Sequence, residues 1–173
     1  LGLGLGLGAL LQRQEICVAW LLWAKHCPGC DLSGAELANA DLKGANLKTA
    51  NLRQARLSQA NLVQSNLVGA DLRQAVLSEA DLAQSHLAGA NLRQADLSLS
   101  NLTGANLEAA RLSRANLSGA NLTQARLRQA GLDQATLLFA DLEGADLRQA
   151  NIQGAQLYGA NLTQTQRAGA VMP

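Results

Sequence analysis

Residues 40–59 read ADLKG-ANLKT-ANLRQ-ARLSQ, which is one five-residue pattern written four times. The same pattern divides the chain from Cys30 to Gln164 into 27 units without an insertion. The third position is Leu in 26 units and Ile152 in the other, the first is Ala in 23, and the second is Asn or Asp in 18. A repeat of this regularity decides the fold before any other feature of the sequence.

A period of five residues excludes a simple helix or a flat strand. On an α-helix, successive Leu side chains would rotate by about 140° and spread around the whole surface. In a straight strand, an odd repeat would send them to alternate sides. Within one unit, however, Ala and Leu are two residues apart and point the same way, while the other residues turn the chain. The spacing therefore predicts a coil whose stacked turns lie about 4.8 Å apart.

The pattern A-(N/D)-L-x-x resembles the pentapeptide-repeat family, including its cyanobacterial members, over about four-fifths of the chain. The resemblance implies an all-β fold, a right-handed quadrilateral β-helix in which four units form each coil. It also implies that the first and third residues point inward and the other three outward. We expect this solenoid to cover residues 30–173, with about seven coils.

Residues 1–29 differ from the repeats and are expected to be a leader followed by a short capping helix. Leu1–Gly8 is a Leu-Gly alternation, and the run Leu1–Leu11 has the length of the apolar region of a signal peptide. A helix is predicted over Gln12–His26. This segment is either the remnant of a signal peptide or a cover for the first coil. The sequence leaves open whether it is cleaved.

The same segment bears on membranes and on localisation. Polar residues 12–15 keep both apolar stretches well below the ~20 residues of a bilayer span, so the sequence argues against membrane spanning. Trp20 and Trp23 are compatible with a helix lying on a membrane surface, but a covered first coil is the simpler interpretation. Ala24–Leu32 resembles the junction of exported cyanobacterial members, which favours periplasm or thylakoid lumen and leaves the cytoplasm open.

Few residues offer chemistry. A core of Leu and Ala predicts no cleft in which polar groups could converge, so we expect no enzyme activity, cofactor or small-molecule substrate. Cys27 and Cys30 flank a Pro-Gly pair, and two thiols at this spacing form a disulfide or half of a zinc site. Zinc would need further ligands, and only His26 and Cys17 are near in sequence, at poor spacing. We expect a disulfide if the protein is exported and free thiols otherwise, with a redox or metal-binding function as an alternative.

The outward residues form ladders if positions 20 apart are stacked. Arg53, Arg73 and Arg93 then make one ladder, here called the arginine ladder, which is either an anion-facing stripe or a solvated face. Its face and one neighbour hold nine basic and five acidic residues, or +4, while the other two faces hold two basic and seven acidic residues, or −5.

Charge argues against nucleic-acid mimicry and against nucleic-acid binding. Some members of the family inhibit DNA gyrase by imitating duplex DNA, which would require roughly 20 negative charges along a rod of this length. Residues 30–164 hold 12 acidic and 11 basic side chains. A DNA-mimicking modulator of a type II topoisomerase is therefore a disfavoured alternative.

Four outward apolar residues predict an interface, and we name them the aromatic patch: Leu99, Leu138, Phe139 and Tyr158. Outward aromatic residues in a chain with so few of them indicate a protein-binding surface. A homodimer through the C-terminal end is a second expected contact, as in members of the family. The sequence thus predicts a non-catalytic structural or binding solenoid that mediates protein–protein interaction, and the partner stays open.

Overall fold

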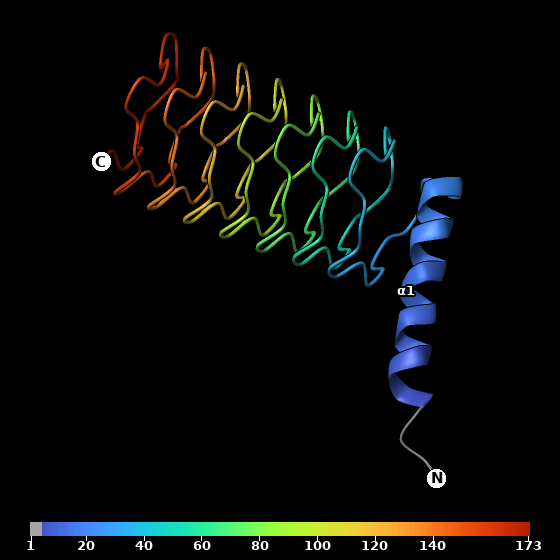
Figure 1. Ribbon diagram of the computed structural model, residues 1–173. Coiled ribbons are helices and arrows are strands. Elements are labelled where there is room, and N and C mark those ends of the chain that lie inside the picture. The colour runs from blue at the N-terminus through green and yellow to red at the C-terminus, as the bar shows by residue number, and fades with distance from the viewer. Residues whose placement is uncertain (1–4) are drawn as a thin grey trace.

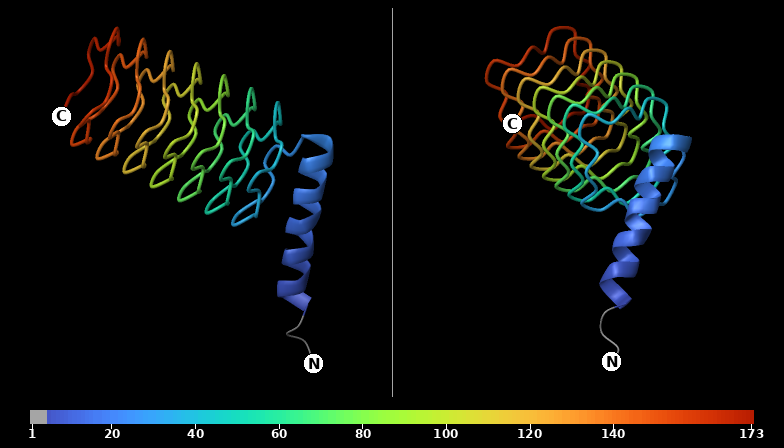
Figure 2. Two further views of the ribbon diagram at one scale, coloured as in Figure 1. Left: turned by 45° about the horizontal axis from the view of Figure 1, so that its top comes forward. Right: turned by 45° about the vertical axis from the view of Figure 1, so that its right-hand side comes forward.

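The computed structural model describes residues 5–173, with side chains from Glu15 onward. The opening of the expected leader, residues 1–4, lies outside the described residues. The first element is a helix, α1 (Leu5–Ala24), after which the chain winds into a stack of similar coils. Figure 1 shows α1 across one end of the stack and the C-terminus at the other, and the views in Figure 2 agree.

Parallel β-bridges join residues that are 20 positions apart, from His26 and Asn46 to Asn151 and Val171. Each bridge is isolated because a turn interrupts the extended segment in every unit. The register means that four units complete one coil of a β-helical solenoid. The right-handed winding and the count of about seven coils stay predictions.

The backbone amides of each unit bond partly to neighbouring coils and partly within a turn. In the unit 50–54, the amides of the second, third and fifth residues donate to carbonyl oxygens of adjacent coils at 2.8, 2.7 and 3.0 Å. The amide of Ala55, which starts the next unit, closes a turn on the Leu52 carbonyl oxygen at 3.1 Å. Most backbone hydrogen bonds therefore depend on the neighbouring coil, so the coils stabilise one another.

Asn and Asp at the second position supply the acceptor for the one remaining amide. Asp81 Oδ1 accepts from the Ala83 amide at 3.1 Å and from Asn101 Nδ2 of the next coil at 3.0 Å. The same two contacts recur around Asp41 and Asp141. A short polar side chain that bonds to the amide two residues ahead stabilises the turn, which explains why this position is so often Asn or Asp.

Leu and Ala at the inward positions form one continuous core, as the repeat pattern predicts. The Leu side chains from Leu32 to Leu147 at third positions are at most 1% exposed. The core cluster extends from Leu21 in α1 to Ala155. Each buried Leu contributes about 1.5–3 kcal/mol, so a regular lattice of Leu and Ala replaces a core of large aromatic side chains, of which this chain has few.

The fifth position of each unit has a left-handed backbone, with φ of 57° at Gln54 and 65° at Gly69. A positive φ favours Gly, yet Gln occurs at these left-handed positions as often as Gly among the described residues. Stacked Gln amides offset the conformational cost, because Gln54 Nε2 donates to Gln74 Oε1 at 3.0 Å and Gln74 Nε2 donates to Gln94 Oε1 at 3.1 Å.

The boundaries of α1 correct the helix expected from the sequence. The expected range was Gln12–His26, whereas α1 begins at Leu5 and ends at Ala24. The helix continues into the Leu-Gly alternation although each interior Gly costs about 1 kcal/mol relative to Ala. At the other end, Lys25 adopts a φ of 53° and His26 already pairs with the next coil. The coiled part therefore starts one unit before Cys30.

α1 covers the N-terminal end of the core. Leu21 is fully buried, and Cys17 and Val18 pack against the same cluster. Lys25 Nζ, just after the helix, lies 2.9 Å from Asp41 Oδ2 and lowers the pKa of that carboxyl, chiefly through their hydrogen bond. α1 therefore contacts the first coil at its open end, which is the position expected of a cap.

The outer side of α1 is apolar. Trp20 and Trp23 are 52% and 78% exposed, and their ring centroids lie 5.3 Å apart. Within residues 5–173, no helix combines the length and the apolar character that crossing a bilayer requires.

Candidate functional site

The aromatic patch lies on one face of the solenoid, at fourth and fifth positions of units in register. Phe139 and Tyr158 are 65% and 76% exposed, yet their rings meet edge to face with centroids 5.6 Å apart. Leu99 is also exposed, and Leu138 is half-buried. The structure therefore brings the two aromatic residues into direct contact while leaving most of their surface open.

Glycines on the next coil leave room for these side chains. A Cβ at Gly159 would clash with the Phe139 ring, and a Cβ at Gly119 would come within 2.7 Å of Leu99 Cδ2. Each large side chain thus leans along the solenoid axis over a glycine one coil further on. This packing restricts the conformations of both side chains before any partner binds.

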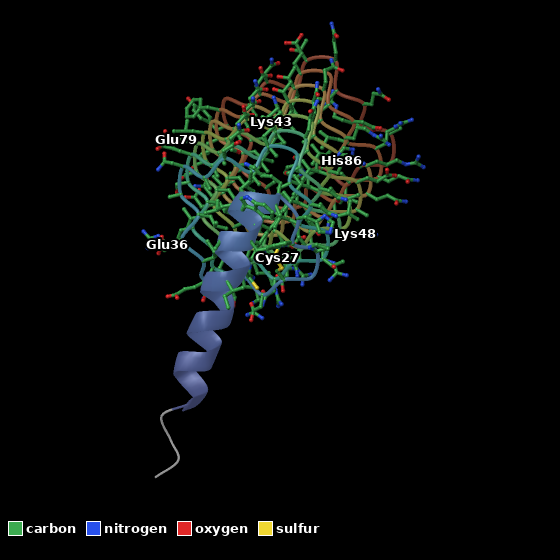
Figure 3. The ribbon with its side chains drawn as sticks, turned by 90° about the vertical axis from the view of Figure 1, so that its right-hand side faces the viewer. Cys27, Glu36, Lys43, Lys48, Glu79 and His86 are labelled. Carbon is green, nitrogen blue, oxygen red and sulfur yellow. A yellow bond between two sulfur atoms is a disulfide. The ribbon has the colours of Figure 1, made fainter. Side chains whose placement is uncertain are left out.

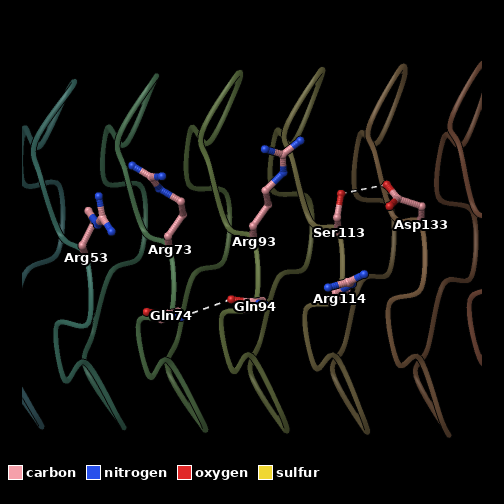
Figure 4. A pocket seen from close by; sticks show the side chains of 8 residues that line it. All are labelled: Arg53, Arg73, Gln74, Arg93, Gln94, Ser113, Arg114 and Asp133. Atoms are coloured by element: carbon pink, nitrogen blue, oxygen red, sulfur yellow. Dashed lines mark hydrogen bonds between the residues drawn. The ribbon is translucent and has the colours of Figure 1, made fainter.

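The arginine ladder borders a polar groove of about 490 Å³ on another face (Figure 4). Figure 4 shows the three arginines on successive coils, with the Gln74–Gln94 and Ser113–Asp133 hydrogen bonds beside them. The groove is lined by Arg53, Arg73, Gln74, Arg93, Gln94, Ser113, Arg114 and Asp133. Four of these side chains are cationic and one is anionic.

The three arginines of the ladder differ in their partners. Arg73 Nη2 lies 2.5 Å from Asp71 Oδ2, and this hydrogen bond holds the pKa of the Asp71 carboxyl below its ordinary value and raises the pKa of Arg73. Within the described part of the chain, Arg53 and Arg93 form no ion pair. The two outer guanidinium groups of the ladder therefore remain accessible to an anion.

The charged side chains are distributed unevenly around the solenoid. Seen from the α1 end in Figure 3, Glu36 and Glu79 lie on one side and Lys48 and His86 on the other.

The cysteines gather where α1 meets the first coil. Cys27 and Cys30 are joined by a disulfide, with Cα atoms 5.4 Å apart, and Cys27 lies beside α1 in Figure 3. Cys17 of α1 is a free thiol, and the three sulfur atoms lie within 4.8 Å of one another. The sequence offered Cys17 and His26 as further candidate ligands at poor spacing. The structure brings Cys17 to the pair, and among the described residues His26 is not part of the group. Extending the repeat frame one unit upstream would have placed Cys27 and Cys30 at inward positions facing the cap.

Comparison with protein families agrees with the repeat. The family model described as "Pentapeptide repeats" matches the sequence in eight copies, in overlapping ranges that run from residue 30 to residue 164. The chain belongs to the pentapeptide-repeat family. No curated protein matches this pentapeptide-repeat protein.

Solved structures of pentapeptide-repeat proteins resemble it to different degrees. QnrB1 (R167E, trypsin-treated), described as a plasmid-mediated fluoroquinolone resistance protein, is 20% identical over 86% of each chain, with a TM-score of 0.64. HetL, described as involved in heterocyst differentiation regulation in the cyanobacterium Nostoc sp. strain PCC 7120, is 31% identical over 92% of this chain and 96% of HetL, with a TM-score of 0.26. The likeness to QnrB1 shows the fold alone.

Proposed function

We propose that this pentapeptide-repeat protein is a non-catalytic binding solenoid that recognises a protein partner through the aromatic patch. The observation that supports this best is the edge-to-face pair of Phe139 and Tyr158, whose rings touch while both stay more than 60% exposed. Aromatic side chains of this kind dominate the binding energy of protein interfaces.

Restricted side chains favour binding at this face. Immobilising a mobile side chain on binding costs about 0.5–1.5 kcal/mol. Phe139 already leans over Gly159, and Leu99 already leans over Gly119. The side chains of the patch have therefore already lost part of their conformational freedom on folding, before a partner binds.

The interior of the solenoid supports binding rather than catalysis. Inward positions hold Leu and Ala, with Ser65, Ser85 and Ser100 as the buried polar residues of the described chain. The polar groove beside the arginine ladder lies open on one face of the solenoid. Its one carboxylate, Asp133, accepts a hydrogen bond from Ser113. General acid–base or nucleophilic chemistry needs a positioned donor and acceptor pair aimed at a substrate.

A DNA-mimicking modulator of a type II topoisomerase has weaker support. The fold of QnrB1 is shared at 20% identity, and a shared fold does not imply a shared function. Residues 30–164 are nearly neutral, whereas duplex DNA has one negative charge per about 1.7 Å.

A paired affinity capture tests the proposed face. The bait is the intact protein, and the test bait is a Phe139→Ala, Tyr158→Ala double variant whose folding has been checked by thermal melting. A Val63→Ala, Val68→Ala double variant is the control, because both valines are half-buried apolar residues on the other faces.

We expect a partner that the intact and control baits recover and the aromatic variant loses. Direct binding of the purified partner, weakened by at least about 30-fold for a contact worth 2 kcal/mol or more, completes the test. Equal recovery by all three baits would remove the aromatic patch from the proposal.

A homodimer through the C-terminal end is a separate proposed contact. Leu157 and Leu162 occupy inward positions there but are only half-buried, and Met172 is 37% exposed. Sedimentation velocity of the intact protein and of a Leu162→Glu, Met172→Glu variant distinguishes dimer from monomer. A monomer at all concentrations would exclude this contact.

A further inference from the structure

All three cysteines of the sequence meet at the junction of α1 and the first coil. Cys27 occupies the third position of the unit 25–29, and Cys30 occupies the first position of the next unit. These are the inward positions that other units fill with Leu and Ala. Their sulfur atoms therefore enter the mouth of the core, where Cys17 faces them from α1.

The distances are close to those of a metal–thiolate site. Zn–S bonds of about 2.3 Å place the sulfur atoms of one metal about 3.8–4.0 Å apart. The three sulfur atoms lie within 4.8 Å of one another. Cys27 and Cys30 are bonded to each other in the disulfide, so their sulfur atoms must move apart by about 2 Å after reduction to reach the separation in a metal site.

The backbone around the three residues is well supported. The Cys27 amide donates to the Asn46 carbonyl oxygen at 2.8 Å, and the Cys30 carbonyl oxygen accepts from the Asn51 amide at 2.8 Å. Cys17 is on α1, where its carbonyl oxygen lies 3.8 Å from Cys27 Sγ. Ligands on regular, hydrogen-bonded elements hold a metal geometry better than ligands on free loops.

Burial also favours a cation. Cys27 is 2% exposed, Cys17 and Cys30 are half-buried, and the fully buried Leu21 packs in the same cluster. Unpaired thiolates in such surroundings would be costly. Soft thiolate ligands select d¹⁰ cations such as Zn²⁺ and Cu⁺, which offset part of that charge.

We propose that Cys17, Cys27 and Cys30, once reduced, bind one thiophilic d¹⁰ cation as three thiolates, with a fourth position open to water. Reduction of the Cys27–Cys30 disulfide by a phosphine yields two thiols and the phosphine oxide, with the oxygen and both protons taken from one water molecule. Three thiols then release three protons as they bind one Zn²⁺, which leaves a site of net charge −1.

The metal would connect two parts of the chain that the disulfide leaves separate. Cys27 and Cys30 are three residues apart, so their disulfide constrains only the entry turn. A metal that also binds Cys17 fixes α1 to the first coil. Binding is therefore expected to raise the melting temperature and to protect the amides around Cys17 from hydrogen exchange.

The test uses the full chain with Zn²⁺ alone. The phosphine-reduced protein, the oxidised protein and the reduced Cys17→Ser and Ala19→Ser variants are titrated under anaerobic conditions against a chromogenic zinc chelator. Cd²⁺ then replaces Zn²⁺, because its thiolate charge-transfer absorption counts the sulfur ligands. Ala19 is exposed on α1, so Ala19→Ser is the matched control that keeps all three thiols.

We expect one Zn²⁺ per reduced chain, three Cd–thiolate bonds and no binding to the oxidised chain. Loss of an outer-shell partner alone weakens metal sites by about 10–100-fold, so loss of the ligand Cys17 should weaken binding by at least about 100-fold. Ala19→Ser should bind like the parent. Equal affinity of Cys17→Ser and the parent, or no binding by the reduced parent, would overturn the proposal. Since the aromatic patch lies at the other end of the solenoid, either result leaves the test of that face unchanged.

Discussion

Inward and outward positions of the same five-residue unit behave very differently. At the first and third positions the side chains hardly vary, whereas at the fourth and fifth positions Arg, Ser, Thr, Gln, Gly and Phe alternate on a backbone of constant hydrogen bonding. Core packing restricts the first set because close-packed interiors tolerate little change of volume. The outer set is limited mainly by contacts between adjacent coils. This difference allows one backbone to present an arginine ladder on one face and an aromatic patch on another.

The largest effect is expected inside the core. Leu92 is fully buried in a middle coil, so Leu92→Arg places an unpaired charge among apolar side chains and should abolish cooperative folding. Thermal melting followed by circular dichroism measures this. Arg93→Ala, on the adjacent outward position, is the control and should melt like the parent. A normal melting curve for Leu92→Arg would contradict the inward register.

The hydrogen bonds accepted by Asn and Asp at the second position should give the next largest effect. Asp81→Ala removes the acceptor for the Ala83 amide and for Asn101 Nδ2, which should cost about 1–3 kcal/mol of unfolding free energy. Chemical denaturation provides the value. His86→Ala, at the same position of the next unit, should change stability by less than about 0.5 kcal/mol. Similar losses of unfolding free energy in both variants would mean that these second-position hydrogen bonds contribute little.

Some substitutions at inward positions should instead stabilise the protein, because two buried hydroxyl groups in the described part of the chain are not hydrogen-bonded. Among the described residues, the Oγ atoms of Ser65 and Ser85 are buried and have no hydrogen-bond partner, whereas Ser100 Oγ donates to the Leu97 carbonyl oxygen at 2.7 Å. Ser65→Ala and Ser85→Ala should each stabilise the protein by about 1 kcal/mol, because they remove an unsatisfied polar group. Ser100→Ala should destabilise it by a similar amount. Equal shifts at all three positions, measured by denaturation, would disprove this distinction.

The smallest effect is expected at the arginine ladder and depends on pH. The Arg73 hydrogen bond lowers the pKa of Asp71 below its ordinary value of 3.8. The resulting stabilisation is present above pH 3.8 and is lost as pH falls through the lower pKa of the folded state. Asp71→Asn should therefore melt slightly below the parent at pH 7, by no more than about 2 °C, and the difference should shrink as pH falls below 3.8 and the folded-state carboxyl becomes protonated. Asn fits this position, as Asn51 and Asn91 occupy it in adjacent coils. A difference that grows in acid would have the wrong sign.

Much of the fold was predictable because the repeat specifies local geometry. Ala and Leu two residues apart must share a side of the extended segment, and the family resemblance supplied four units per coil. The sequence did not reveal that Gln54, Gln74 and Gln94 stack through their amides at a left-handed position. Such a ladder depends on side chains 20 residues apart, and single-residue preferences at a positive φ favour Gly instead.

The candidate sites were predictable to different degrees. Phe139 and Tyr158 follow from register alone, since 20-residue stacking places their units on one face. The partners of the arginines could not be predicted from register. Arg73 bonds to Asp71, whereas Arg53 forms no ion pair within the described residues. That choice depends on the rotamers of long side chains, which the repeat does not restrict.

The sequence by itself determined the period and the core, because a strict repeat gives every unit the same local environment. The faces on which the outward side chains lie also needed the four units per coil that the family resemblance implied. Only the tertiary structure decided where α1 lies and hence that Cys17 meets Cys27 and Cys30. The helix lies outside the repeat, so no periodicity fixes its direction. Its position follows from packing Val18 and Leu21 over the end of the core, and that packing brings together sulfur atoms that are ten or more residues apart in the chain.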